Sequence, residues 1–216
     1  MIAPYKLNRP RIILFSSLAL LTLYVFIIGE LLFFLSGNPE IHRYKVMSWL
    51  LVPHAILGAI ALTIGPFQFS SNLRTKNIAL HKKLGKIYII SILSAVPFAI
   101  LINIYYPIPG AKATFAFENI AQALVWGTTA LMAWIAASKR QITIHKMWAA
   151  RSYGVTLIFV LSRIYNPMQL FIEKADINDF SHFLWLLLVL ALIIPDLLVF
   201  NKELFRTKKY KNKTRQ

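Results

Sequence analysis

The chain of 216 residues contains no cysteine and few charged residues. Without cysteine it can form no disulfide bond, no thiolate metal site and no C-x-x-C-H haem attachment. Charged residues make up 15% of the sequence, against about a quarter in soluble domains. Hydrolase motifs are missing too, since neither G-x-S-x-G nor H-E-x-x-H occurs.

Acidic residues are the scarcer charge, with 8 Asp and Glu against 24 Lys and Arg, which gives a formal net charge of +16. A strongly basic chain by itself would suggest a nucleic-acid partner. However, 57% of the residues are hydrophobic, and a compact soluble fold has nowhere to bury so much apolar surface. An integral membrane protein fits both numbers, and we expect no nucleic-acid partner.

Six mostly apolar stretches are long enough to cross a bilayer, which takes about 20 helical residues. The sequence therefore predicts an all-α fold, a polytopic membrane helix bundle that forms a single domain over 1–216. The first stretch is too long for a removable signal peptide and is expected to stay as an anchor. The predicted spans are 12–35, 46–69, 87–106, 115–138, 147–172 and 180–200.

The positions of the cations predict the orientation of these six spans. Of the 24 Lys and Arg residues, 19 fall in the even-numbered loops and the two ends of the chain. Because Lys and Arg concentrate on the cytoplasmic side, both termini are predicted to lie inside. The basic tail, 201–216, is expected to bind anionic lipids of the bilayer.

Two ionisable residues lie at the same predicted depth inside the membrane. Arg163 and His54 each lie about 12–13 Å from the outer ends of their helices. Ionisable groups at such depth usually face the bundle interior and are candidates for function. Arg163 could instead form a structural ion pair, and His54 could be a core histidine bonded to a serine or a carbonyl.

Helical spacing predicts which faces of two spans point inward. His54 shares one face with small residues that allow close helix packing, so it is expected to point into the bundle; they are Gly58, Ala61 and Gly65. In the fifth span one narrow polar stripe is predicted, which consists of His145, Ser152, Thr156 and Arg163.

A second polar group is expected on the cytoplasmic side. His81 and His145 each come just before a predicted span, in similar contexts that form a weak internal repeat, and Arg151 follows His145. Histidines from two hairpins could face each other across the bundle as haem-iron ligands. Alternatively, each histidine could cap a helix N-terminus at the membrane interface.

The same residues carry a family resemblance. The run from Gly65 to Phe69, His81-x-x-x-Gly85-x-x-Tyr88 and His145-x-x-Trp148-x-x-Arg151 resemble the domain of unknown function 2306 family of predicted bacterial membrane proteins. This resemblance extends from Val46 to about Phe200. It implies a multi-pass protein of the bacterial inner (plasma) membrane with histidines at these places, and no established activity.

Three functions remain open on these grounds. The first is redox-linked cofactor binding, of a b-type haem or a quinone, through His54, His81, His145, Arg151 and Arg163, with His81 and His145 as the metal ligands. The second is a small transporter or proton-coupled carrier that uses Arg163 and His54, for which six helices would require a homodimer. The third is a non-catalytic scaffold or assembly factor whose polar residues only fix the packing of the helices.

Overall fold

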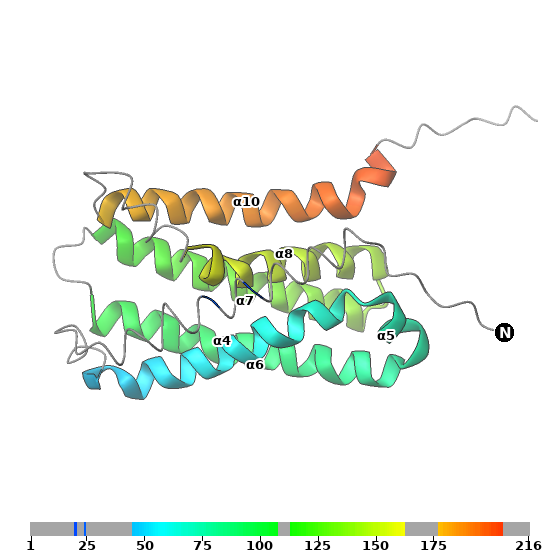
Figure 1. Cartoon of the computed structure of the whole chain (residues 1–216), viewed down its shortest axis with the longest axis horizontal. Coiled ribbons are helices and arrows are strands. Elements are labelled where there is room, and N and C mark those ends of the chain that lie inside the picture. The colour runs from blue at the N-terminus through cyan, green and yellow to red at the C-terminus, as the bar shows by residue number, and fades with distance from the viewer. Residues whose placement is uncertain (1–19, 21–23, 25–44, 108–112, 163–176, 205–216) are drawn as a thin grey trace, which may run out of the picture.

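The computed structural model describes residues 20, 24, 45–107, 113–162 and 177–204, and every regular element in these ranges is a helix. The long helices run almost parallel to one another, and a short one joins the first two (Figure 1). They are α4 (Ser48–Gln68), α5 (Ser71–Lys76), α6 (Ile78–Tyr105), α7 (Ala113–Ser138), α8 (Ile142–Ser162) and α10 (Ile177–Leu204).

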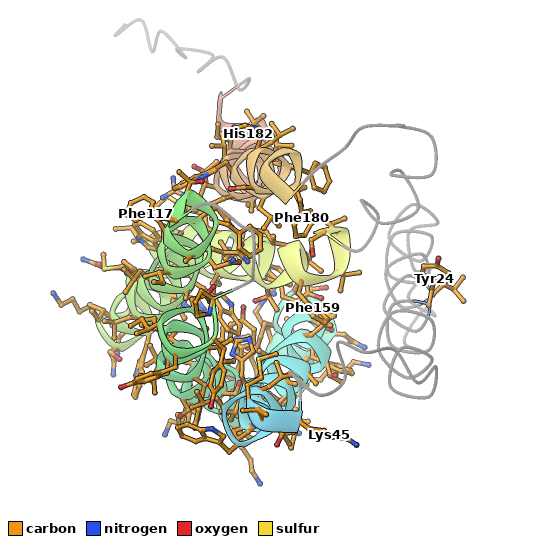
Figure 2. All side chains as sticks on the ribbon, turned by 90° about the vertical axis from the view of Figure 1, so that its left-hand side faces the viewer. Tyr24, Lys45, Phe117, Phe159, Phe180 and His182 are labelled. Atoms are coloured by element: carbon orange, nitrogen blue, oxygen red, sulfur yellow. The ribbon has the colours of Figure 1, made fainter. Side chains whose placement is uncertain are left out.

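Four of these helices form a ring. α4 packs on α6, α6 on α7 and α7 on α8, and a smaller contact between α8 and α4 closes the ring. α10 lies outside it against α8 and α7, as Figure 2 shows in a view along the helices. Because of this order, α6 and α8 face each other diagonally across the ring, and so do α4 and α7.

One end of the bundle contains most of the cations of the described chain. It contains α5 and the turn between α7 and α8, which lie together on the right in Figure 1. We call it the basic end. Its cations are Arg74, Lys76, Lys82, Lys83, Lys86, Lys139, Arg140 and Lys146.

Two helices begin earlier than the hydropathy of the sequence predicts. α6 starts at Ile78 instead of residue 87, and α8 starts at Ile142 instead of residue 147. The Asn77 side chain caps α6, since its Oδ1 accepts the Leu80 N–H at 2.9 Å. Hydropathy marks the membrane core, whereas a helix continues through lysines, which are good helix formers. His81 and His145 therefore lie within the first turns of their helices, not before them.

Four of the described helices are long and apolar enough to cross a membrane: α4, α6, α7 and residues 180–197 of α10. The chain is therefore a helical membrane bundle that spans the bilayer several times. α8 carries Lys146 and Arg151 and is not among the four. The predicted span 12–35 apart from residues 20 and 24, the part of 147–172 after Ser162 and the tail from residue 205 lie outside the described residues.

A proline in α4 sets how α8 packs against it. Pro66 has no N–H, so it leaves the carbonyl of Leu62 without its helical donor. The hydroxyl of Tyr153 on α8 lies 3.4 Å from that carbonyl oxygen and donates to it. The Tyr153 ring covers Gly65, where a Cβ atom would come within 2.1 Å of the ring. Only a glycine at position 65 permits this approach.

A second proline shapes the contact between α8 and α10. Pro195 leaves the carbonyl of Ala191 without its helical donor, and Gly154 of α8 packs directly on that carbonyl. A Cβ atom at Gly154 would lie 2.5 Å from the Ala191 oxygen. α8 is thus seated between the two helices at the points where their prolines interrupt the backbone hydrogen bonds.

Candidate functional site

His54 faces the interior of the ring, as its helical face predicts. Its Nδ1 lies 3.1 Å from the Ala95 carbonyl oxygen of α6, and its ring meets the Trp126 ring edge-on with centroids 6.5 Å apart. Because a carbonyl only accepts, Nδ1 carries the proton and Nε2 is left as an acceptor. His54 is therefore a core histidine bonded to a carbonyl, which is one of the alternatives that the sequence left open.

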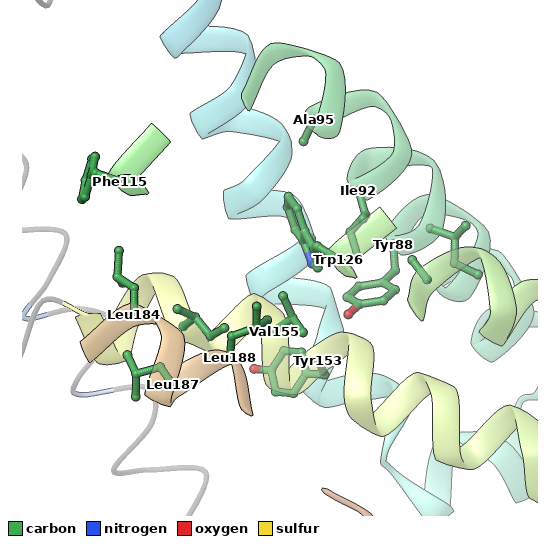
Figure 3. Close-up of a cluster of buried hydrophobic side chains, with 14 residues drawn as sticks. Tyr88, Ile92, Ala95, Phe115, Trp126, Tyr153, Val155, Leu184, Leu187 and Leu188 are labelled. Carbon is green, nitrogen blue, oxygen red and sulfur yellow. The ribbon is translucent and has the colours of Figure 1, made fainter. Parts of the chain in front are cut away.

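The centre of the ring holds a hydrogen-bonded group of four buried side chains from α6, α7 and α8. Trp126 Nε1 donates to Thr156 Oγ1 at 2.9 Å. The Tyr88 hydroxyl lies 3.0 Å from Ser152 Oγ and 3.2 Å from Thr156 Oγ1. Thr156 donates in turn to the Ser152 carbonyl at 2.9 Å. Figure 3 shows Tyr88 and Trp126 projecting toward each other in this core.

These four side chains satisfy one another. Every donor in the group has an acceptor, so a ligand would have to break a hydrogen bond to bind there. The two central residues of the predicted polar stripe of α8, Ser152 and Thr156, therefore serve helix packing. Such closed networks specify one arrangement of a core.

At the basic end, His145 and His81 approach from the diagonal helices α8 and α6. His145 Nδ1 lies 2.9 Å from the Ala133 carbonyl oxygen of α7, so its Nε2 is the acceptor. Both His145 and Arg74 lie near enough to the His81 imidazole to act on its charge. The structure therefore gathers the two histidines that the sequence paired.

Two polar atoms at this end are buried without a hydrogen-bond partner among the described residues. They are Nδ1 of His81 and Nε2 of Gln68. The Gln68 side chain reaches over Gly85 of α6, and its backbone carbonyl accepts from Arg74 Nη1 at 3.1 Å. A buried polar group without a partner is costly, which makes this the place where a bound group would supply hydrogen bonds.

Arg151 belongs to a different set of contacts. Its guanidinium forms a two-pronged ion pair with Asp196 of α10, with Nε 3.0 Å from Oδ1 and Nη2 bonded to Oδ2. It also stacks on the ring of Trp148, with Cζ 4.7 Å from the centroid. The structure thus uses Arg151 to join α8 to α10.

The remaining predicted site residue, Arg163, lies outside the described residues. Within the described ranges no three His, Asp or Glu side chains gather as a metal site. A haem needs only two axial ligands from the protein, so this leaves a histidine pair available.

One buried ionisable group was missed by sequence reasoning. Glu118 lies in the second turn of α7, fully buried, and neither carboxylate oxygen has a partner among the residues described. Glu118 lies inside the predicted span 115–138, but no role was assigned to it from the sequence. The signal that could have found it is the glutamate itself, placed inside a helix of mostly apolar residues.

The fold and these buried polar groups define a class: a multi-pass helical membrane protein. Comparison with known families gives the more particular assignment. Residues 51–200 match the family described as Predicted membrane protein (DUF2306), and the chain belongs to that family. This confirms the resemblance of the sequence. No curated protein and no solved structure matches the chain.

Proposed function

We propose that this protein binds a redox cofactor, a b-type haem, between His81 and His145 at the basic end of the bundle. The observation that supports it best is the placement of the two imidazoles. They come from diagonal helices at one end and lie within electrostatic reach of each other. Two histidines facing each other across a bundle are the usual axial ligands of such a haem.

The hydrogen bond of His145 supports a ligand role. Histidines that ligate a metal usually donate their other ring N–H to a carbonyl or carboxylate, which fixes the tautomer and the ring plane. His145 donates in this way to the Ala133 carbonyl at 2.9 Å, and its Nε2 is left basic. His54 has the same arrangement with Ala95 and is the second histidine suited to a cofactor.

The cations of the basic end suit the carboxylates of a haem. Arg74 lies beside His81, and Lys82, Lys83 and Lys146 neighbour the two histidines along the chain. Arg151 is held by Asp196, so we assign it to support the helix that carries His145. A bound haem would supply one-electron chemistry, and the protein would supply its ligands, charge compensation and an apolar setting.

The proposal includes a topology and a location. We place six spans with both termini in the cytoplasm of a bacterial inner membrane, so that the basic end and its histidines face inward. Residues 201–216 would then bind anionic lipids.

The absorption spectrum of the purified protein, expressed with added haem, tests the proposal. We expect a Soret band with the sharp bands of low-spin haem. His81→Ala and His145→Ala should each remove the low-spin spectrum, and the double variant should bind no haem. His182→Ala is the matched control, because His182 is exposed on α10. Absence of a Soret band, or an unchanged band in the double variant, would overturn it.

The scaffold alternative has an observation of its own. Tyr88, Trp126, Ser152 and Thr156 satisfy one another and need no ligand. If the protein is a scaffold, His81→Leu should change the yield of folded protein, and no haem absorption spectrum should be seen with or without the substitution. A carrier using Arg163 and His54, or a quinone held between them, stays a prediction from the sequence.

A further inference from the structure

The first turns of α7 contain three buried oxygen acceptors with no donor among the described residues. Glu118 is 0% exposed, and both its carboxylate oxygens lack a hydrogen-bond partner in the part of the chain described. Oε1 of Gln122, one helical turn further along, is also buried without a partner among these residues. Side chains four residues apart lie next to each other on one helix face. Three unsatisfied acceptor atoms therefore share one place.

Among the described residues, no cation lies on the half-helices that surround Glu118. The titratable residues with described side chains on the neighbouring half-helices are His54 on α4, Tyr105 on α6 and His182 on α10, while α8 has none between Gly154 and Ser162. None of them forms a hydrogen bond or ion pair with Glu118. An ionised carboxylate in such a place, without a cation, is very costly.

A single proton on Glu118 would remove most of this cost. A protonated carboxyl group is a donor as well as an acceptor, and its O–H can donate to the Oε1 of Gln122 one turn away. That bond removes the buried charge and gives the amide oxygen its missing donor. Protonation thus leaves only a neutral carbonyl oxygen of Glu118 without a donor among the described residues.

We propose that Glu118 is a proton-binding site of this protein, with Gln122 as the acceptor that holds the proton, and that it exchanges with the side opposite the basic end. Glu118 lies about 8 Å from the start of α7 and about 30 Å from its end. The shorter path therefore leads away from the basic end. The proposal stands independently of haem binding at His81 and His145.

Infrared difference spectroscopy of the full chain in liposomes, recorded as the pH is changed, tests this directly. We expect the C=O band of a buried carboxylic acid in the wild type, and its complete loss in Glu118→Gln. Gln keeps the shape and the neutral charge, so the variant should fold. Glu203→Gln, in the last turn of α10, is the matched control and should keep the band.

Two further measurements keep the proposal falsifiable. In Gln122→Leu the band should persist but shift to the frequency of a more weakly hydrogen-bonded acid. In D2O the wild-type band should shift, because the proton exchanges with solvent. A band unaffected by Glu118→Gln would overturn the proposal. The proposal would also be overturned if Glu118 stayed ionised at every pH. A Na⁺-dependent rise in melting temperature that Glu118→Gln removes would overturn it as well, since the bound species would then be a metal cation.

Discussion

Gly65 and Gly58 lie seven residues apart on α4 and differ in what surrounds them. The sequence placed both on one small-residue face for close helix packing. At Gly65 a Cβ atom would come within 2.1 Å of the Tyr153 ring, whereas at Gly58 it would meet nothing within 4 Å. Of these two glycines, only Gly65 is therefore required by the packing of a neighbouring helix.

This difference gives a prediction with an internal control. Gly65→Ala should lower the free energy of unfolding by about 2 kcal/mol, because the Tyr153 ring must move and lose its bond to the Leu62 carbonyl. Gly58→Ala should leave it unchanged or raise it by up to about 1 kcal/mol, since alanine favours the helix. Denaturant unfolding in detergent micelles measures both. Equal losses in the two variants would contradict this account of the packing.

The polar residues of the core show what sequence reasoning can recover at this scale. Spacing alone placed Ser152, Thr156 and His145 on one face of their helix. It did not reveal that Tyr88 and Trp126 complete the network, because that depends on which helices lie diagonally. Glu118 was missed although it lies within the predicted span 115–138. A buried carboxylate has no sequence pattern other than its position in an apolar helix.

At the scale of helices, the joint between α8 and α10 combines shape with charge. Gly154 packs on the carbonyl that Pro195 leaves free, and Arg151 pairs with Asp196 in the next turn. The side chains of Arg151 and Asp196 are 23% and 31% exposed, so water only partly screens the pair. Asp196 is the only acidic residue in the predicted span 180–200.

Removing one member of this pair should cost more than removing both. We expect Arg151→Leu to lower the melting temperature because Asp196 then remains at the helix interface without its partner. Adding Asp196→Leu should recover part of that loss, with a coupling free energy of about 1 kcal/mol in a double-mutant cycle. Thermal unfolding of the four proteins measures it. Strictly additive losses would show that the pair contributes nothing.

Helix positions were predicted better than helix ends. The spans predicted at 46–69, 115–138 and 180–200 correspond to α4, α7 and α10 within a few residues. The start of α6 was missed by nine residues, since its first turns contain lysines and a histidine. A membrane excludes such side chains from its apolar core, but hydrogen bonding along the backbone continues past them. Hydropathy therefore locates the membrane, and only capping residues such as Asn77 locate the helix end.

For the whole molecule, the absence of cysteine makes the orientation easy to measure. Single cysteines can be introduced at Lys83, at the basic end, and at Lys45, at the opposite end, and both positions are exposed. If the basic end faces the cytoplasm, a membrane-impermeant thiol reagent should label Lys45→Cys but not Lys83→Cys in intact cells. Permeabilised cells should label both. The reverse pattern in intact cells would invert the topology.

The diagonal hydrogen bonds at the centre of the ring bear on how the bundle could move. A carrier that opens alternately to either side must rock one half of its helices against the other. Here Tyr88 joins α6 to α8, Tyr153 joins α8 to α4, and His54 joins α4 to α6 and touches α7. Any plane that divides the ring cuts at least one of these braces inside an apolar core, where water cannot replace it. If a haem is bound as proposed, this frame would hold it at a fixed distance from its redox partner, whereas a carrier would have to break these bonds in each transport cycle.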